Sequence, residues 1–376
     1  MRTPETKAAL PKDAPTEGDP EKLGWQRFRF QVPLYAHSIY RLMELPDGRL
    51  FGTAGAYEGN FIFDPKTGEG KHLGKTHLSH YATAFHDGRI YMSGYPTSPL
   101  YVFDPAKPWT AGTFVKNRRV ADTDETANPR QLLYLGTKEL AGTHKMYAGV
   151  TAADGKVYFG GRWVRDGACG GLAWYDPKTG KAGGLWQPIS NYQITHIATA
   201  NDGRLVVISA RRVDDSVLKK PKPEGGALWF FDPQKGELTG KFEPVPKAKG
   251  PGPIANVGGS RIFGWTEDPE NGKASILYAV DVNGPKLLFT RPLPFPLPVE
   301  IGSNQQEAWD FRVGPDGLVW TFMQNVLVRI DPKDGAIQPM GHPGAAGRIA
   351  FADGKVFLGG TPAIRRIKDF PVPARQ

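Results

Sequence analysis

Histidine is the residue whose distribution in this sequence points most directly to chemistry. The chain has eight histidines, and five of them precede an Asp-Gly turn by six to ten residues, in four consecutive copies of one sequence unit. These five are His37, His77, His80, His144 and His196. Histidine changes protonation near neutral pH and serves as a general acid, a general base or a metal ligand. Its recurrence at one point of a repeated unit predicts a shared site.

Tyrosine, tryptophan and arginine accompany these histidines. Counting back from the turns places His80 at the level of Tyr40 and Tyr147. The residues expected beside the histidines are Tyr57, Tyr95, Tyr147, Tyr192, Arg162, Arg211, Trp163 and Trp309. The candidate carboxylates are fewer, namely Glu58, Glu307 and Asp310. Aromatic faces stack on sugar rings and arginine binds carboxylates, so the set favours an anionic, ring-shaped ligand.

A site of His, Tyr and Arg is suited to β-elimination from a uronic acid. Elimination needs a base for the C5 proton, a cation beside the carboxylate and an acid at the leaving oxygen. The catalytic candidates are His80 or His144 as base, Tyr147 or Tyr192 as acid, and Arg162 or Arg211 on the carboxylate. The substrate-binding candidates are His37, His77, His196, Tyr57, Tyr95, Trp163 and Trp309. We therefore expect a lyase acting on an anionic polysaccharide, with no cofactor required.

The elements that position these residues are short β-strands in a repeated unit. The first turn of each unit is Asp-Gly or an equivalent, a strong hairpin signal because it accepts positive φ. The strands after the seven first turns read RLFGTA, RIYMSG, KVYFGG, RLVVIS, RIFGWT, LVWTFM and KVFLGG. Six third strands read NFIFDP, PLYVFDP, GLAWYDP, ALWFFDP, ILYAVDV and VLVRIDP. Four strands in each of seven units predict an all-β, seven-bladed β-propeller.

The seventh unit supplies only three of its four strands. We expect a strand at residues 26–32 to complete it, because closing the ring removes free sheet edges. The chain then reads as a flexible tail at 1–22 and one propeller at 23–376, with insertions at about 108–143 and 212–226. In such a ring the inner strand of every blade lines a central channel, and the site lies where these strands begin.

The Asp-Pro turns also carry a resemblance. Those that continue to Thr-Gly, at residues 64–68 and 176–180, resemble turns of the YVTN/quinoprotein-like and virginiamycin-lyase-like propellers. The resemblance covers about residues 26–368 and implies the fold, because these motifs specify turns and one fold hosts many functions. The composition of the site is similar to that of propeller-type polysaccharide lyases, which use His, Tyr and Arg.

Other functions remain open alongside the lyase. His37, His77 and His144 share one height and could bind a divalent metal ion, either for catalysis or for structure. A propeller can instead bind a ligand or a protein without catalysis, or carry a glycoside hydrolase, although no convergent carboxylate pair is evident. A quinone-cofactor dehydrogenase ranks below these, since no dedicated metal and stacking platform is evident.

Composition narrows the partners. The net charge of +9 is dispersed in short runs such as Arg118-Arg119, which argues against nucleic acid and for an ordinary solvated surface. No stretch has the length of a transmembrane helix, so we expect no membrane partner, and we expect a monomer. The single cysteine, Cys169, reads as a packing residue. The polar, Pro-rich start fits either a cytoplasmic protein or a periplasmic or secreted protein whose signal was removed.

Overall fold

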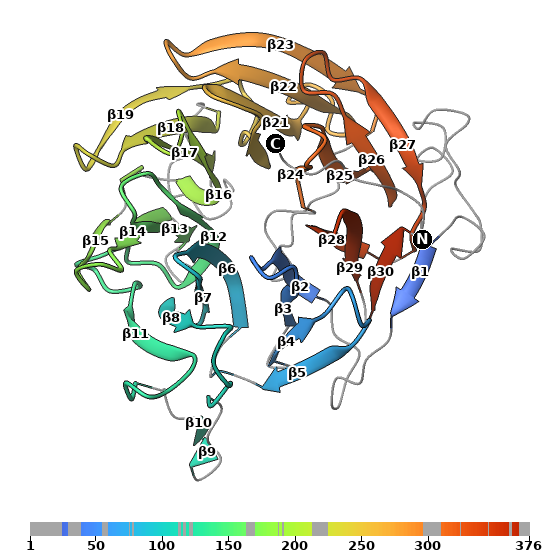
Figure 1. The fold of residues 1–376 in the computed structure, drawn as a ribbon. Coiled ribbons are helices and arrows are strands. Elements are labelled where there is room, and N and C mark those ends of the chain that lie inside the picture. The colour runs from blue at the N-terminus through green and yellow to red at the C-terminus, as the bar shows by residue number, and fades with distance from the viewer. Residues whose placement is uncertain are drawn as a thin grey trace.

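The computed structural model describes residues 25–28, 39–54, 59–74, 76, 79–111, 114–115, 118–119, 123–162, 170–186, 188–189, 192–212, 225–295, 310–323, 325–344, 346–360 and 363–367. These residues form strands β1 to β30, arranged as seven four-stranded antiparallel sheets and one two-stranded hairpin. The sheets stand around a ring as the blades of a β-propeller (Figure 1). This confirms the predicted fold class. The part of the chain described here contains no helix, and so no helix that could span a membrane.

The blades follow one another along the chain, and each runs from an inner to an outer strand. Blade one is β2 (Ile39–Glu44), β3 (Leu50–Ala54), β4 (Gly59–Phe63) and β5 (Gly70–Gly74); blade two is β6 (Ser79–His86), β7 (Arg89–Tyr95), β8 (Pro99–Phe103) and β11 (Arg130–Tyr134). Blade three is β12 (Lys145–Thr151), β13 (Val157–Arg162), β14 (Gly170–Tyr175) and β15 (Ala182–Leu185); blade four is β16 (Tyr192–Ala200), β17 (Leu205–Arg212), β18 (Ala227–Asp232) and β19 (Glu237–Phe242). Blade five is β20 (Ile254–Asn256), β21 (Arg261–Glu267), β22 (Ser275–Asp281) and β23 (Lys286–Leu293); blade six is β24 (Arg312–Val313), β25 (Val319–Met323), β26 (Val326–Ile330) and β27 (Ile337–Gly341). Blade seven is β28 (Ala346–Ala352), β29 (Lys355–Gly360), β30 (Ile364–Ile367) and β1 (Trp25–Phe28).

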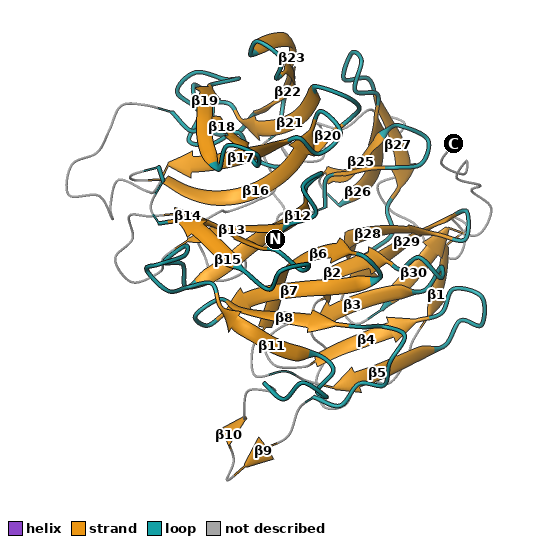
Figure 2. Cartoon of the chain, turned by 60° about the vertical axis from the view of Figure 1, so that its left-hand side comes forward, coloured by secondary structure: helices purple, strands orange, loops and turns teal. Residues whose placement is uncertain are grey.

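The N-terminal strand closes the ring, as expected. β1 pairs antiparallel with β30, with Trp25 opposite Ile367 and Phe28 opposite Ile364. The described strand covers residues 25–28, within and just before the predicted range of 26–32. The N-terminal strand β1 therefore shares one sheet with the three C-terminal strands β28, β29 and β30. It forms the outer edge of blade seven (Figures 1 and 2).

The Asp-Pro turns have the chemistry that their sequence predicts. The Asp176 carboxylate accepts a hydrogen bond from the backbone N–H of Lys178 at 2.9 Å, and the Asp176 carbonyl accepts one from Gly180 at 2.8 Å. Gly180 has φ +72°, a left-handed conformation that favours glycine. The same pattern recurs at Asp64 and Gly68. These turns fix the strand pairing on the face opposite the site.

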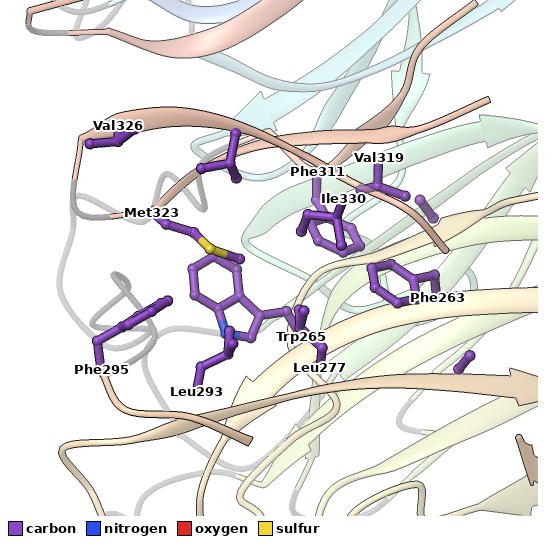
Figure 3. Close-up of a cluster of buried hydrophobic side chains, with 13 residues drawn as sticks. Phe263, Trp265, Leu277, Leu293, Phe295, Phe311, Val319, Met323, Val326 and Ile330 are labelled. Carbon is purple, nitrogen blue, oxygen red and sulfur yellow. The ribbon is translucent and has the colours of Figure 1, made fainter. Parts of the chain in front are cut away.

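The hydrophobic core lies between neighbouring blades. Between blades five and six, Trp265 packs with Met323 and Phe295, and Phe263 stacks on Phe311 (Figure 3). Trp265 is 1% exposed. Burying a large side chain of this kind stabilises the fold by about 2–3 kcal/mol. Because each blade pair has such a cluster, the ring holds its inner strands in fixed positions.

The two expected insertions have different outcomes. The stretch 108–143 holds β11, which is the outer strand of blade two, and the hairpin of β9 (Phe114–Val115) and β10 (Arg118–Arg119). Most of 212–226 lies outside the described residues, as does the 1–22 segment. For those two segments the expectation stays a prediction.

Candidate functional site

A β-bulge marks the same level of the inner strand in five blades. In each of these strands one residue, the second to the fourth of the inner strand, is skipped in the pairing with the second strand. The skipped residues are Tyr40, Tyr81, Tyr147, Thr195 and Gly347. A bulge bends the strand and re-aims its side chains, and bulges are frequent beside functional sites. We call this end of the ring the top face.

The bulges correct the alignment made on the Asp-Gly turns. In blade two only Asp87 and Gly88 separate the last strand pair, His86 with Arg89, whereas five residues separate Glu44 from Leu50 in blade one. The shorter turn shifts the count by one residue. Tyr81, and not His80, is therefore the structural equivalent of Tyr40 and Tyr147.

Tyrosine rings and lysine form a continuous contact chain across blades one to three. Tyr40 stacks on Tyr81 with ring centroids 5.0 Å apart. The Lys145 ammonium lies 4.0 Å from the centroid of Tyr81 and 5.3 Å from that of Tyr147. Lys145 is 4% exposed, so these cation–π contacts are largely shielded from water, where they are strongest.

Arg162 and Tyr147 form the polar end of this chain. The Arg162 guanidinium lies 5.5 Å from the Tyr147 ring centroid and donates a hydrogen bond of 3.2 Å to the side-chain oxygen of Gln193 in blade four. Among the described residues, the Tyr147 hydroxyl and the Arg162 Nε are buried without a hydrogen-bond partner. Burial raises the pKa of Tyr147, and the nearby Arg162 charge offsets only part of that rise. The hydroxyl therefore stays protonated near neutral pH and can donate.

His196 joins the same group of residues through Arg41. The Arg41 guanidinium reaches from blade one to blade three and donates to the Tyr147 carbonyl at 2.7 Å. Burial, and then the charge of Arg41, lower the pKa of His196 to about 3. His196 Nδ1 lies 3.2 Å from the Thr195 hydroxyl oxygen. The imidazole is thus neutral near pH 7 and has a lone pair that can accept a proton.

Further cations at this level complete the backbone bonding of inner strands. An inner strand is a sheet edge, so its outward carbonyls and N–H groups need partners. Arg348 of blade seven donates to the Tyr40 carbonyl at 2.6 Å, and its guanidinium lies 3.8 Å from the Asp310 carboxylate. Asp310 also accepts from the Ile349 N–H at 2.8 Å. Asp310 is thereby engaged in holding blade seven against its neighbours.

Four predicted site residues, Tyr192, Arg211, His144 and Tyr95, lie in contacts of other kinds. The Tyr192 hydroxyl donates to the Gly225 carbonyl at 2.9 Å, and its ring packs in a hydrophobic cluster. Arg211 is paired with Glu267 at 3.1 Å between blades four and five. His144 lies edge-on to Tyr95 with centroids 4.9 Å apart. The Tyr192 hydroxyl and the Arg211 guanidinium therefore have partners outside the Tyr147 and Arg162 pair.

Several predicted residues cannot be placed. His37, His77, Tyr57, Trp163 and Trp309 lie outside the described residues, and for His80 only the backbone, paired with Gly94, is described. Among described residues, no three His, Cys, Asp or Glu side chains gather as metal ligands. Of the three metal candidates only His144 is described, so the metal site stays a prediction.

Sequence reasoning missed two cations and one tyrosine of the site. Lys145, Arg41 and Tyr81 were not among the candidates, because the histidine pattern of the sequence does not include them. A signal was present: once a shorter turn is allowed for in the second unit, Tyr40, Tyr81 and Tyr147 stand at corresponding points of three adjacent units.

Comparison with solved structures bears out the architecture. A streptogramin B lyase structure has a TM-score of 0.59 at 12% identity, with 91% of this chain and 96% of that chain covered. A catalytically inactive His-to-Ala variant of virginiamycin B lyase from Staphylococcus aureus with Quinupristin has a TM-score of 0.56 at 11% identity, covering 91% and 98%. The chain has the propeller fold of these lyases.

The likeness is one of fold alone. A hydrazine synthase chain from Kuenenia stuttgartiensis has a TM-score of 0.59 at 10% identity, covering 88% of this chain and 94% of that chain. No protein-family model and no curated protein matches this sequence. Since lyase and synthase chains match equally well, the reaction has to be argued from the site.

Proposed function

We propose that this protein is a lyase that cleaves a uronic-acid-containing polysaccharide by β-elimination at the top face of the propeller. The observation that carries the proposal is the buried, unpartnered hydroxyl of Tyr147 beside the Arg162 guanidinium. An unpartnered buried polar group costs about 1–3 kcal/mol. An oxygen-rich anion bound here would accept a hydrogen bond from the hydroxyl, so relief of that cost would contribute to the binding free energy.

Cations beside the substrate carboxylate make the C5 proton acidic. Arg162 has no carboxylate within ion-pair distance in the described part of the chain, and its Nε is available for a new hydrogen bond. The Lys145 ammonium also lies 5.3 Å from the Tyr147 ring centroid, and Lys145 is opposite Arg162 in the pairing of β12 with β13. Both cations would stabilise the additional negative charge that develops on a bound carboxylate in the enolate-like transition state, which lowers the barrier.

Proton transfer would use the opposite protonation states of His196 and Tyr147. His196, neutral near pH 7, takes the C5 proton; the C5–H electron pair forms the C4–C5 double bond, and the C4–O bond breaks. Tyr147 gives its proton to the leaving oxygen. Exchange with water returns both groups to their starting states. A carboxylate nearby raises the pKa of His196 and so strengthens it as a base.

The alternatives for each role are weaker on geometry. His144 Nδ1 accepts a hydrogen bond of 3.3 Å from the Thr97 N–H, so in the neutral ring the other nitrogen carries the proton. The Tyr192 hydroxyl and the Arg211 guanidinium already have partners. His80 stays a candidate base. A hydrolase would need a pair of carboxylates, and Asp310 is held by Arg348 and Ile349.

The test is to incubate the protein with alginate, polygalacturonate and hyaluronan and to follow the ultraviolet absorbance of the unsaturated uronate. We expect the absorbance to rise with one of these polymers. Arg162→Ala and His196→Asn should each lower the rate of that rise by about 100-fold or more. A parallel reaction with chelator reports whether a metal takes part. No rise with any uronic-acid polymer would overturn the lyase.

A non-catalytic anion-binding propeller is the second candidate. The low pKa of His196 favours it, because a base that weak in the free protein removes a carbon-bound proton slowly. In that case the same polymers would bind, Arg162→Ala would weaken binding, and no unsaturated product would form. Calorimetric titration beside the absorbance assay separates the two functions.

A further inference from the structure

The two strongly exposed aromatic residues in the described part of the chain, Tyr134 and Trp186, lie on one side of the ring. Only four large hydrophobic side chains are exposed among the residues described: Tyr134 at 40%, Trp186 at 49%, Leu287 at 38% and Leu288 at 37%. The two leucines belong to β23 in blade five. Tyr134 ends β11 of blade two, and Trp186 directly follows β15 of blade three. Both therefore lie at the ends of neighbouring outer strands (Figure 1).

Trp186 is seated on a glycine. A Cβ at Gly142 would overlap the indole atoms Cδ1 and Nε1, so the ring rests directly on the glycine backbone. Gly142 has φ +62°, which also favours glycine. The N–H of Gly142 donates to the Thr137 carbonyl at 2.7 Å, and that of Ala141 to the Leu135 carbonyl at 3.1 Å. One side of the indole is thus fixed while half of the side chain faces water.

This seat is joined to the top face by a short piece of chain. Gly142 stands two residues before His144, a backbone distance of about 7 Å at most. Tyr134 is opposite Pro99, where β8 begins, and β7 ends beside it at Tyr95. Both exposed aromatic residues therefore lie at the same end of the blades as the site, farther from the ring axis.

The surroundings of Trp186 fit a sugar better than a protein. The loop between Tyr134 and Gly142 exposes Thr137, Lys138 and Glu139, so the aromatic rings are separated by polar surface. A protein partner buries a contiguous apolar patch of several hundred Å². A pyranose ring needs only one flat aromatic face under its C–H groups and polar groups around its hydroxyls.

We infer that Trp186, seated on Gly142, is an outer subsite that binds a sugar ring of a polysaccharide whose cleaved unit lies at the top face, with Tyr134 as a second contact. The inference rests on the proposed lyase and adds that the substrate is a polymer crossing blades two and three. Trp186 acts only in binding, so its loss affects long substrates and leaves short ones unaffected.

The experiment compares Trp186→Ala with Trp186→Phe, which keeps a flat ring, and with Leu287→Ala, which removes an exposed apolar group elsewhere. Binding is measured by retardation in gels that contain alginate, polygalacturonate or hyaluronan. Elimination is measured on the same polymers and on their tetrasaccharides. Trp186→Ala is expected to weaken polymer binding and raise the polymer KM by about tenfold. The kcat/KM of Trp186→Ala on tetrasaccharides should equal that of the wild type. Trp186→Phe and Leu287→Ala should match the wild type in polymer binding and in polymer KM.

The two proposals fail in different ways. Retardation that Trp186→Ala loses, with no elimination by any form of the protein, would refute the lyase and support the subsite. Elimination with equal polymer KM in wild type and Trp186→Ala would overturn the subsite and leave the lyase intact. A wild-type protein that none of the three gels retards would also overturn the subsite.

Discussion

Tyr147→Phe removes one oxygen atom from the centre of the proposed site, and its effect on stability tests the argument before any substrate is known. The hydroxyl is buried and has no partner among the described residues, so the folded state gains nothing from it. Its desolvation costs about 1–3 kcal/mol. Allowing for the small void that the substitution leaves, Tyr147→Phe should raise the free energy of unfolding by about 1 kcal/mol.

Tyr192→Phe is the matched control, because it removes the same atom from a tyrosine of similar burial. Tyr192 is 6% exposed and Tyr147 is 7% exposed. The Tyr192 hydroxyl donates to the Gly225 carbonyl, which would be left unpaired. Tyr192→Phe should therefore lower the free energy of unfolding by about 1–2 kcal/mol. The two substitutions should change stability in opposite directions.

Denaturant titration is the better assay for this comparison. With an unfolding entropy of about 2.1 cal/mol/K per residue, 1 kcal/mol shifts the melting temperature of a 376-residue chain by only about 1 °C. The effects on activity should be the opposite of those on stability. Tyr147→Phe should lower kcat by about 100-fold or more, whereas Tyr192→Phe should leave kcat within about twofold of the wild type. If Tyr147→Phe unfolds more easily than the wild type, the hydroxyl has a structural partner and the reasoning is wrong.

Three further predictions concern pH, channel contacts and closure. The pKa of His196 is about 3 in the folded protein, so below pH 6.5 the unfolded chain binds one more proton than the folded chain. The free energy of unfolding should therefore fall by roughly 1 kcal/mol per pH unit as the pH is lowered from 6 to 4. Thermal melts at several pH values should show a weaker pH dependence for His196→Asn. The Glu44 carboxylate forms an ion pair with Arg312 at 2.7 Å, and both side chains are partly exposed. Glu44→Gln should therefore lower the free energy of unfolding in denaturant titration by about 1 kcal/mol. No change would show that the ion pair contributes nothing to stability. Deleting residues 1–28 removes the four pairings of β1 with β30 and should cost about 2–4 kcal/mol, whereas deleting residues 1–22 should leave the melting curve unchanged.

The fold was predictable because its signals are local and repeated. Asp-Gly and Asp-Pro turns depend on a few adjacent residues, and an error in one unit is corrected by the other six. Ring closure followed from counting strands, since the last unit had three. Exact strand limits were less accessible, because pairing with strands from distant parts of the chain, as between β1 and β30, and not local composition sets them.

The site was only partly predictable, because side-chain height depends on turn length and on bulges. Counting from Asp87 placed His80 level with Tyr147, but the two-residue turn and the bulge make Tyr81 the equivalent residue. Tyr147 and Arg162, each a site candidate from the sequence, lie on adjacent strands of blade three, with the guanidinium 5.5 Å from the ring centroid. Partners that come from other blades, such as Gly225 for Tyr192, are set by packing that no local pattern contains.

The arginines Arg41, Arg348 and Arg162 differ in what the fold requires of them, and this difference identifies the guanidinium that is available to a ligand. Arg41 and Arg348 stand on inner strands, and their guanidinium groups complete backbone hydrogen bonds of neighbouring blades. Removing either leaves a carbonyl of a sheet edge without its donor, so the loss is mainly one of stability. Arg162 ends the second strand of its blade and bonds a side-chain amide instead. Its guanidinium can therefore turn toward an anion without breaking the ring, which is why we assign the carboxylate to Arg162.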